Sequence, residues 1–210
     1  MTQKPSRKGL MLILSSPSGA GKTTLTRRLL KEYNDITMSV SATTRKPREG
    51  EVDGQDYYFV THDIFNEMVD NDQMLEHATV FDNLYGTPRE PVNAALNAGN
   101  DIIFDIDWQG AQQISGKEGV VRIFILPPSI TELRSRLKSR GQDDEDVISK
   151  RMSEAKNEIS HWEAYNYVLI NDNFEETYEN LKNILKAERL KLSQQPAIPL
   201  FARSLMNNAG

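Results

Sequence analysis

A glycine-rich stretch between positions 15 and 24 carries residue types that suit the binding of phosphate groups. Gly19 and Gly21 permit backbone angles that a side chain would forbid, so successive N–H groups can turn toward one anion. Lys22 adds a mobile positive charge for terminal phosphates, and the Thr23 hydroxyl can hold a magnesium ion. The stretch therefore predicts binding of a nucleoside triphosphate. The residues expected to surround its phosphates are Ser16, Pro17, Ser18, Gly19, Ala20, Gly21, Lys22, Thr23 and Thr24.

The elements on either side must place this stretch between a strand and a helix. An apolar run, Leu10–Leu14, leads into it, and a helical pattern that includes Leu25 and Leu29 leads out. Strand, glycine-rich turn and helix together are the context of a phosphate-binding loop. Ser16 replaces the first glycine of the formal pattern G-x-x-x-x-G-K-[ST], while the spacing is kept. A structural turn with the same letters is the alternative, and the flanking elements favour the phosphate loop.

Acidic side chains follow a second apolar run, Ile102–Phe104. In proteins with a phosphate loop, an acid at the end of such a strand commonly helps to hold magnesium, and Asp105 has this position. Asp107 lies two residues further on and projects to the same side. A turn or helix cap is the alternative for Asp105, and the phosphate loop favours the metal role.

Two groups of arginines could bind further phosphates, because a guanidinium group suits bidentate contacts with them. Arg45 and Arg48 lie in a short polar loop punctuated by proline and glycine. Arg136 and Arg140 are one helical turn apart, and Arg151 lies on the following predicted helix. A movable hairpin with these arginines would supply positive charge and exclude water, as phosphoryl transfer requires. A solvated basic loop and a pair of surface helices joined by salt bridges are the alternatives.

Glu76 is an acid in an otherwise apolar strand. A buried carboxylate needs a partner, and guanine offers two adjacent N–H donors, at N1 and at the exocyclic amine. One ionised carboxylate can accept both, whereas adenine has an unprotonated N1 and would be rejected. The alternative is an edge-strand acid that faces solvent, and the residue pattern alone favours that alternative.

Apolar strands alternate with helical patterns, which predicts an α/β fold whose parallel sheet is covered by helices on both faces. Ligands of such folds lie at the carboxyl ends of the strands, which places the phosphate loop, Asp105, Asp107 and Asn171 around one crevice. Residues 45–87 break the rhythm and are interpreted as an inserted mixed subdomain, with a turn over Asn83–Pro88. The tail after Ser193 has no periodicity. The five predicted core strands are Leu10–Leu14, Thr37–Ser41, Asp101–Ile106, Val120–Leu126 and Tyr167–Ile170.

The composition excludes several classes of protein. The 210 residues carry a net charge of −5, so a nonspecific nucleic-acid surface is not expected. The absence of cysteine excludes disulfides, a thiolate zinc site and a cysteine nucleophile. No apolar run approaches the roughly 20 residues that span a membrane, and no apolar signal segment follows the basic N-terminus. We therefore expect a cytoplasmic protein with no membrane partner.

Several segments together resemble the guanylate kinase family, over about Gly9 to Leu192. The motifs T-T-R-x-P-R-x-G-E and D-I-D-x-Q-G are specific when they accompany a phosphate loop. The likeness is to small bacterial-type enzymes rather than to a module inside a scaffold. The segments that carry it are the phosphate loop, Ser41–Glu51, Asp53–Tyr57, Asn83–Thr87 and Asp105–Gly110.

The resemblance implies the P-loop nucleoside-phosphate kinase fold: a five-stranded parallel sheet, an inserted α+β GMP-binding subdomain and a helical lid. The implied core comprises residues 9–42, 88–129 and 160–192, the insertion 43–87 and the lid 130–159. Residues 1–8 and 193–210 would be flexible tails. The implied reaction is the magnesium-dependent transfer of the ATP γ-phosphoryl group to GMP, and dGMP is a second expected acceptor. Because the family includes monomers and larger assemblies, homo-oligomers are compatible with the resemblance.

The resemblance also implies roles for single residues. The implied catalytic set is Lys22, Arg48, Arg136, Arg140 and Arg151. Asn171 would lie near the adenine of ATP, and Thr23 and Asp105 would hold magnesium. The implied GMP-binding set is Ser41, Arg45, Arg48, Tyr57, Glu76, Tyr85, Thr87 and Asp107, in which Ser41, Glu76 and Thr87 read the base.

Two other functions remain as alternatives. A monophosphate kinase with another preferred base would share the loop and the arginines, but Ser41, Glu76 and Thr87 argue against it. A noncatalytic module that holds partner peptides in its GMP region would typically have a damaged phosphate loop. Lys22 and Thr23 are in place here, which favours the enzyme.

Overall fold

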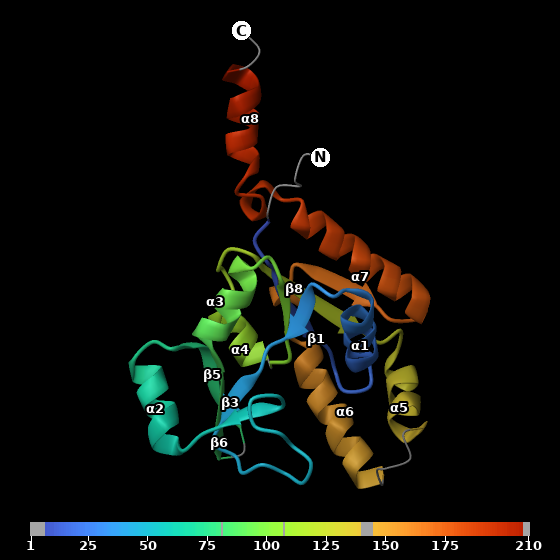
Figure 1. The fold of residues 1–210 in the computed structure, drawn as a ribbon. Helices are drawn as coiled ribbons and strands as arrows, with labels where there is room; N and C mark the ends of the chain where they lie inside the picture. The colour runs from blue at the N-terminus through green and yellow to red at the C-terminus, as the bar shows by residue number, and fades with distance from the viewer. Residues whose placement is uncertain (1–6, 81, 107, 140–144, 208–210) are drawn as a thin grey trace.

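Two sheets organise the computed structural model, which describes residues 7–80, 82–106, 108–139 and 145–207 (Figure 1). The strands are β1 (Met11–Ser15), β2 (Ile36–Met38), β3 (Ser41–Thr43), β4 (Tyr57–Phe59), β5 (Met74–Val80), β6 (Asn83–Pro88), β7 (Asp101–Phe104), β8 (Val120–Leu126) and β9 (Tyr167–Ile170). The helices are α1 (Lys22–Glu32), α2 (His62–Asp70), α3 (Arg89–Asn97), α4 (Trp108–Gln113), α5 (Ile130–Ser139), α6 (Glu145–Ile159), α7 (Phe174–Arg189) and α8 (Ile198–Asn207), with short 3-10 helices at Trp162–Ala164 and Leu192–Gln194.

The larger sheet has five parallel strands in the order β2-β7-β1-β8-β9, which confirms the predicted fold class. Its two faces are apolar because the central strands are buried on both sides. Leu25 of α1 and Tyr178 of α7 belong to the core cluster on one face. Val92 of α3 and Ala111 of α4 belong to the cluster on the other face. Helices therefore cover both faces, and the carboxyl ends of the strands remain available for a site.

The smaller sheet has four strands in the order β4-β3-β6-β5. Phe65 of α2 is fully buried and packs with Ala42 and Met74 against one face of this sheet. Figure 1 shows this sheet beyond the same end of the five-stranded sheet as α5 and α6. The two groups of elements therefore lie on either side of the region where the core strands end.

Two strand predictions in this region are wrong. The predicted strand Thr37–Ser41 is divided, because β2 ends at Met38 in the five-stranded sheet and β3 begins at Ser41 in the other. The segment Asn83–Pro88, expected as a turn, is strand β6 and pairs antiparallel with β5. The reversal lies earlier, at Asp82, whose φ of +63° is in the left-handed region that turns require.

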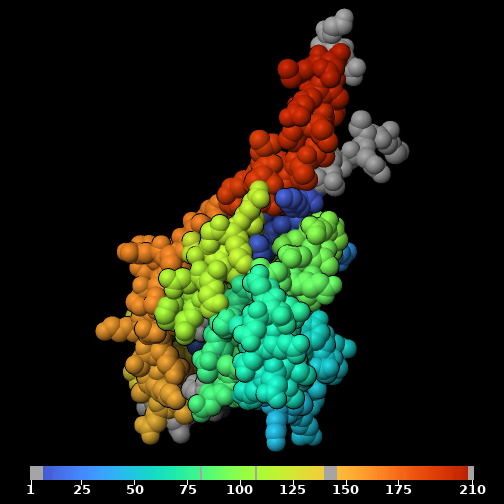
Figure 2. Space-filling view, turned by 90° about the vertical axis from the view of Figure 1, so that its left-hand side faces the viewer, coloured from blue at the N-terminus to red at the C-terminus, as the bar shows by residue number. Residues whose placement is uncertain are grey.

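The ends of the chain are more ordered than predicted. Arg7, expected in a flexible tail, donates hydrogen bonds to Asp35 and to the fully buried Asp101, and Arg189 of α7 contacts the same two acids. Beyond α7, the structure has a helix where no regular structure was expected: α8 projects from the body at the end opposite α5 and α6 (Figures 1 and 2). Its apolar side chains, Leu200, Phe201, Leu205 and Met206, are exposed.

Within the described residues, the helices are too short or too polar for any of them to cross a membrane.

Candidate active site

The phosphate loop joins the end of β1 to the first turn of α1, as the motif predicts. Gly19 and Gly21 have φ values of +95° and +108°, which L-residues with side chains rarely adopt. A Cβ atom on Gly21 would also lie 2.2 Å from Nδ2 of Asn171. The positive end of α1 therefore faces a loop whose backbone can curl around an anion.

Asn171, expected near adenine, is buried against this loop. Its Nδ2 donates a hydrogen bond to the carbonyl oxygen of Ala20 at 2.7 Å. Asn171 follows β9, so it reaches the loop from the carboxyl end of an edge strand. In this structure the side chain supports the loop conformation directly.

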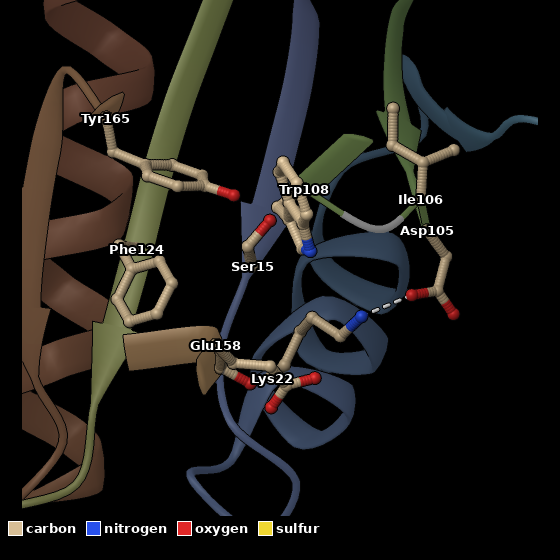
Figure 3. A pocket seen from close by; sticks show the side chains of 9 residues that line it. Ser15, Lys22, Asp105, Ile106, Trp108, Phe124, Glu158 and Tyr165 are labelled. Carbon is tan, nitrogen blue, oxygen red and sulfur yellow. Dashed lines mark hydrogen bonds and ion pairs between the residues drawn. The ribbon is translucent and has the colours of Figure 1, made fainter. Parts of the chain in front are cut away.

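Lys22 and Asp105 form an ion pair at the mouth of the loop (Figure 3). Both line a cavity of about 280 Å³ whose other walls include Ser15, Trp108 and Glu158. On the other side of the pair, Thr23 and Asp105 line a cavity of about 240 Å³. The structure thus brings together the predicted phosphate lysine and the two predicted magnesium ligands.

Glu158 is a residue at this site that sequence reasoning missed. It lies on α6, and its carboxylate faces the phosphate loop. It also lines a cavity of about 240 Å³ that loop residues 16–19 and 21–24 surround. Burial raises the pKa of Glu158 above its usual value, while the backbone N–H of Ser18 and the charge of Lys22 act in the opposite direction. An anionic side chain therefore occupies part of the anion-binding loop.

A second group of predicted residues meets in the four-stranded sheet. Glu76 of β5 is 5% exposed, and the hydroxyl of Thr87, on the partner strand β6, donates to its Oε1 atom at 2.6 Å. The solvent-facing alternative for Glu76 is therefore wrong. A Cβ atom on Gly110 of α4 would lie 2.6 Å from the other carboxylate oxygen, Oε2. Ser41 begins β3, and β3 pairs with β6. Ser41 therefore lies two strands away from Glu76 of β5.

Arg45, Tyr57 and Tyr85 form a third group. The guanidinium of Arg45 lies 5.3 Å from the centre of the Tyr57 ring, and the nearby Tyr85 helps to raise the pKa of Arg45. The rings of Tyr57 and Tyr85 meet edge to face, with centroids 6.1 Å apart. Burial is the main cause that raises the pKa of Tyr57, and Tyr85 adds to it. The structure thus gathers three residues of the implied GMP-binding set.

Glu51 organises this third group, and it had no assigned role in the sequence. Its carboxylate accepts two hydrogen bonds from Arg45, at 3.0 and 2.7 Å, and one from the backbone N–H of Arg48 at 2.7 Å. These contacts raise the pKa of Arg45 and lower that of Glu51, with the mutual hydrogen bond as the largest cause for each. The sequence did contain a signal for this role of Glu51: in the motif R-K-P-R-E-G-E, it is the last residue and follows both arginines.

The predicted lid arginines are only partly placed. Arg136 of α5 pairs with Glu132 at 2.8 Å and donates to the backbone oxygen of Asn171 at 3.1 Å, so it contacts the phosphate-loop side of the site. Arg151 lies on α6, two helical turns before Glu158. Arg140 and Asp107 lie outside the described residues.

Comparison with known proteins places the chain in a family. A family model described as guanylate kinase matches residues 8–188. A guanylate kinase of Ruegeria sp. (strain TM1040) is 58% identical over 205 residues, which cover 96% of this chain and 94% of that protein. A guanylate kinase of Rhodopseudomonas palustris (strain BisB5) is 56% identical over 201 residues, 95% of this chain and 92% of that protein. The crystal structure of guanylate kinase from Anaplasma phagocytophilum superposes with a TM-score of 0.73 at 40% identity, covering 96% of this chain and 97% of that one.

Proposed function

The chain belongs to the guanylate kinase family, and we propose that it transfers the γ-phosphoryl group of ATP to GMP, giving ADP and GDP, in a magnesium-dependent reaction. The observation that carries the proposal is the placement of two sites at one helix, α4. Its first residue, Trp108, lines the cavity that holds Lys22, and Gly110 lies against the buried carboxylate of Glu76. A phosphate-binding loop and a base-reading carboxylate are therefore within reach of one pair of substrates.

Base selection follows from the state of Glu76. Thr87 donates to one of its oxygens, and an ionised carboxylate has further lone pairs for the N1–H and the exocyclic amine of guanine. Adenine would present an acceptor at N1 instead of a donor, which would leave the buried carboxylate facing a lone pair. A site built to bond particular N–H groups rejects analogues that lack them much more strongly than an apolar pocket does.

The phosphate of GMP would bind at the third group, at Arg45, Arg48, Tyr57 and Tyr85. Arg45 and the Arg48 backbone are held by Glu51, so the loop is organised before substrate arrives. A preorganised donor does not have to be ordered during the reaction, which favours transition-state stabilisation. Arg48, Arg136, Arg140 and Arg151 are proposed to add positive charge when the insertion and the lid close.

ATP would bind with its phosphates in the loop and its adenine near Asn171. The ion pair between Lys22 and Asp105 must then open, so that Lys22 can contact the phosphates. The hydroxyl of Thr23 and the carboxylate of Asp105 are hard oxygen donors on one cavity wall, which fits a magnesium ion that takes its other ligands from phosphate and water. When bound, the ion supplies charge neutralisation on the phosphates.

The transfer itself is proposed to be a direct in-line displacement. A phosphate oxygen of GMP bonds to the γ-phosphorus while the bond from that phosphorus to the ADP oxygen breaks. Lys22 and the arginines spread the charge of the transition state, and no covalent enzyme intermediate is needed. Closure around both substrates converts an encounter of two molecules into a local step.

Finer expectations accompany this function. We also propose dGMP as an acceptor, as the family resemblance implies. A cytoplasmic location remains a prediction, homo-oligomers are compatible with the proposal, and nucleic acid is not an expected partner.

The test is ADP release from ATP and magnesium with GMP, dGMP, AMP, UMP or CMP as the acceptor. Turnover confined to the two guanine nucleotides supports the proposal. Turnover that prefers another base would keep the kinase and refute the role of Glu76. A folded protein that binds GMP without any turnover would refute the enzymatic function and favour a binding module.

A further inference from the structure

The burial of Glu76 depends on an irregularity in strand β5. Met74, Leu75 and Glu76 are consecutive, yet all three are buried, with 5%, 8% and 5% exposure. A regular strand sends successive side chains to opposite faces, so Glu76 would share the face of Met74, which packs with Phe65, and not the face of Leu75. The register with β6 shifts at this point, since Met74 pairs with Pro88 and Glu76 with Thr87. The bulge turns Glu76 inward although Leu75 already packs into the core cluster that contains Val92.

Immediately after the bulge, a core helix holds the strand. Strand β5 is an edge strand, and the backbone N–H and C=O of His77 point away from β6. The side chain of Gln113, the last residue of α4, satisfies both groups. Its Oε1 accepts from His77 N at 3.1 Å, and its Nε2 donates to His77 O at 2.7 Å. The amide side chain thus pairs with β5 as the peptide of another strand would.

The same face of α4 also limits where the carboxylate can lie. Gly110 is three residues before Gln113, so the two positions share a helical face. At Gly110 a Cβ would lie 2.6 Å from Glu76 Oε2, whereas its next contact outside this carboxyl group would be Ile106 at 3.4 Å. With Thr87 at the opposite oxygen, the carboxylate lies between a hydroxyl donor and a glycine surface.

We propose that Gln113 and Gly110 are positioning residues for base selection: Gln113 holds the strand after the bulge, and Gly110 leaves room for the carboxylate of Glu76. The inference rests on the proposed function, in which Glu76 reads guanine. In this proposal, α4 fixes the carboxylate of Glu76 relative to the phosphate loop, because Trp108 of the same helix lines the cavity around Lys22.

The first test is Gln113→Ala, with Gln112→Ala as the matched control. Gln112 is the neighbouring residue on α4. It is exposed, as Gln113 is, and it faces a separate cavity beside Trp108 and His161. We expect Gln113→Ala to raise KM for GMP about threefold to tenfold, as the loss of two neutral hydrogen bonds suggests, with kcat and KM for ATP nearly unchanged. Gln113→Glu keeps the acceptor and loses the donor, so its KM should lie between those of the wild type and Gln113→Ala.

Discrimination against IMP gives a readout that a general loss of stability would not move. Hypoxanthine keeps the N1–H of guanine and lacks the exocyclic amine, so the ratio of kcat/KM for GMP over IMP reports how well the carboxylate is placed. Gln113→Ala should reduce this ratio and Gln112→Ala should not. If the two variants have the same KM for GMP and the same ratio, the role of Gln113 is refuted.

Gly110→Ala tests the second residue. Alanine is intrinsically better than glycine inside a helix, and Gly110 does not have a positive φ, so the backbone itself tolerates the change. We expect KM for GMP to rise about tenfold or more because the added methyl group displaces the carboxylate. The double-mutant cycle with Glu76→Ala should be non-additive, since that change removes the atoms that the methyl group meets. An equal effect of Gly110→Ala in both backgrounds would overturn its assignment.

The outcomes separate this inference from the proposed function. If Glu76→Gln leaves guanine preference intact, the role of Glu76 fails and the inference falls with it. If Glu76→Gln abolishes the preference while Gln113→Ala and Gly110→Ala leave GMP kinetics unchanged, the function stands and the positioning role is wrong.

Discussion

The phosphate loop and the proposed base-reading site, formed by Glu76, Thr87 and Gly110, are built in different ways. The loop is one continuous stretch whose main ligands are backbone N–H groups at the start of α1. The base-reading site combines side chains of β5 and β6, 11 residues apart in the sequence, with the surface of α4, where Gly110 lies 23 residues after Thr87. A backbone site depends on local conformation, whereas a side-chain site depends on a bulge, a strand register and a contact between two sheets. The first kind therefore leaves a compact motif, and the second does not.

The two sites also differ in what a substrate must do on arrival. At the loop, Asp105 pairs with Lys22 and the carboxylate of Glu158 lines the loop cavity, so incoming phosphates would replace two carboxylates. At the base-reading site, Thr87 already satisfies part of Glu76, and guanine would add donors to it. Binding would be an exchange at the loop and an addition at the base-reading site, so removal of a carboxylate charge should have opposite consequences in the two places.

Lys22→Ala should give the largest effect. We expect kcat to fall about 10³-fold or more, because the lysine would stabilise charge on the transferring phosphoryl group. GMP binding, measured by calorimetry, should be unchanged, since the base-reading site contains no part of the loop. Lys31→Ala, near the exposed end of the same helix, is the control. A comparable loss of GMP affinity in Lys22→Ala would show that the two regions are not independent.

Glu76→Gln should have the second largest effect. The amide keeps one acceptor and presents an NH₂ group to a donor of guanine, so kcat/KM for GMP should fall about 10²-fold or more. KM for ATP should remain within about twofold, because a side-chain change in the second sheet leaves the loop backbone in place. Steady-state kinetics with each substrate varied in turn provide the measurement. A parallel rise in KM for ATP would contradict the separation of the two sites.

Sequence reasoning succeeded where neighbouring residues decide the structure. The loop was identified from ten consecutive positions, and the strands Val120–Leu126 and Tyr167–Ile170 have the predicted bounds. Apolar runs were sufficient for the core because both faces of its sheet are buried. The family resemblance stated from the motifs is confirmed by the family model and by the relatives.

Sequence reasoning failed where contacts between distant segments decide the structure. Gly86 and Pro88 suggested a turn, yet the segment becomes β6 because the reversal at Asp82 presents it to β5. The pattern around Glu76 favoured solvent exposure, whereas the bulge in β5 turns its carboxylate toward Gly110 of α4. Glu158 is one acid among several on α6, so its position at the loop depends on tertiary packing alone. Helix α8 did leave a signal, since Pro199 lies in its first turn, where proline is favoured.

Glu158→Gln should have a smaller effect, in the opposite direction to Lys22→Ala. Removing a negative charge from the loop leaves less competition for phosphate, so KM for ATP should fall about twofold to fivefold at neutral pH. Glu154→Gln, one turn earlier on the exposed side of α6, is the matched control. A rise in KM for ATP would show that Glu158 assists nucleotide binding and would break the description of loop binding as an exchange.

The smallest effect should be the pH dependence of the stability difference between the wild type and Glu158→Gln. Burial raises the pKa of Glu158 in the folded protein, so the folded state takes up its proton at a higher pH than the unfolded state. Stability contributed by this group therefore increases as the pH falls through the raised pKa toward the ordinary value, and it decreases as the pH rises. Acids with lowered pKa values, such as Glu51 and Asp35, affect stability in the other direction. They are present in both the wild type and Glu158→Gln, so their contributions cancel in the Tm difference. The Tm of the wild type minus that of Glu158→Gln should thus increase by no more than a few degrees between neutral pH and the usual carboxyl range. A difference that decreases over this interval would mean that the backbone N–H of Ser18 and the charge of Lys22 outweigh burial, and that the loop stabilises the carboxylate as it would a phosphate.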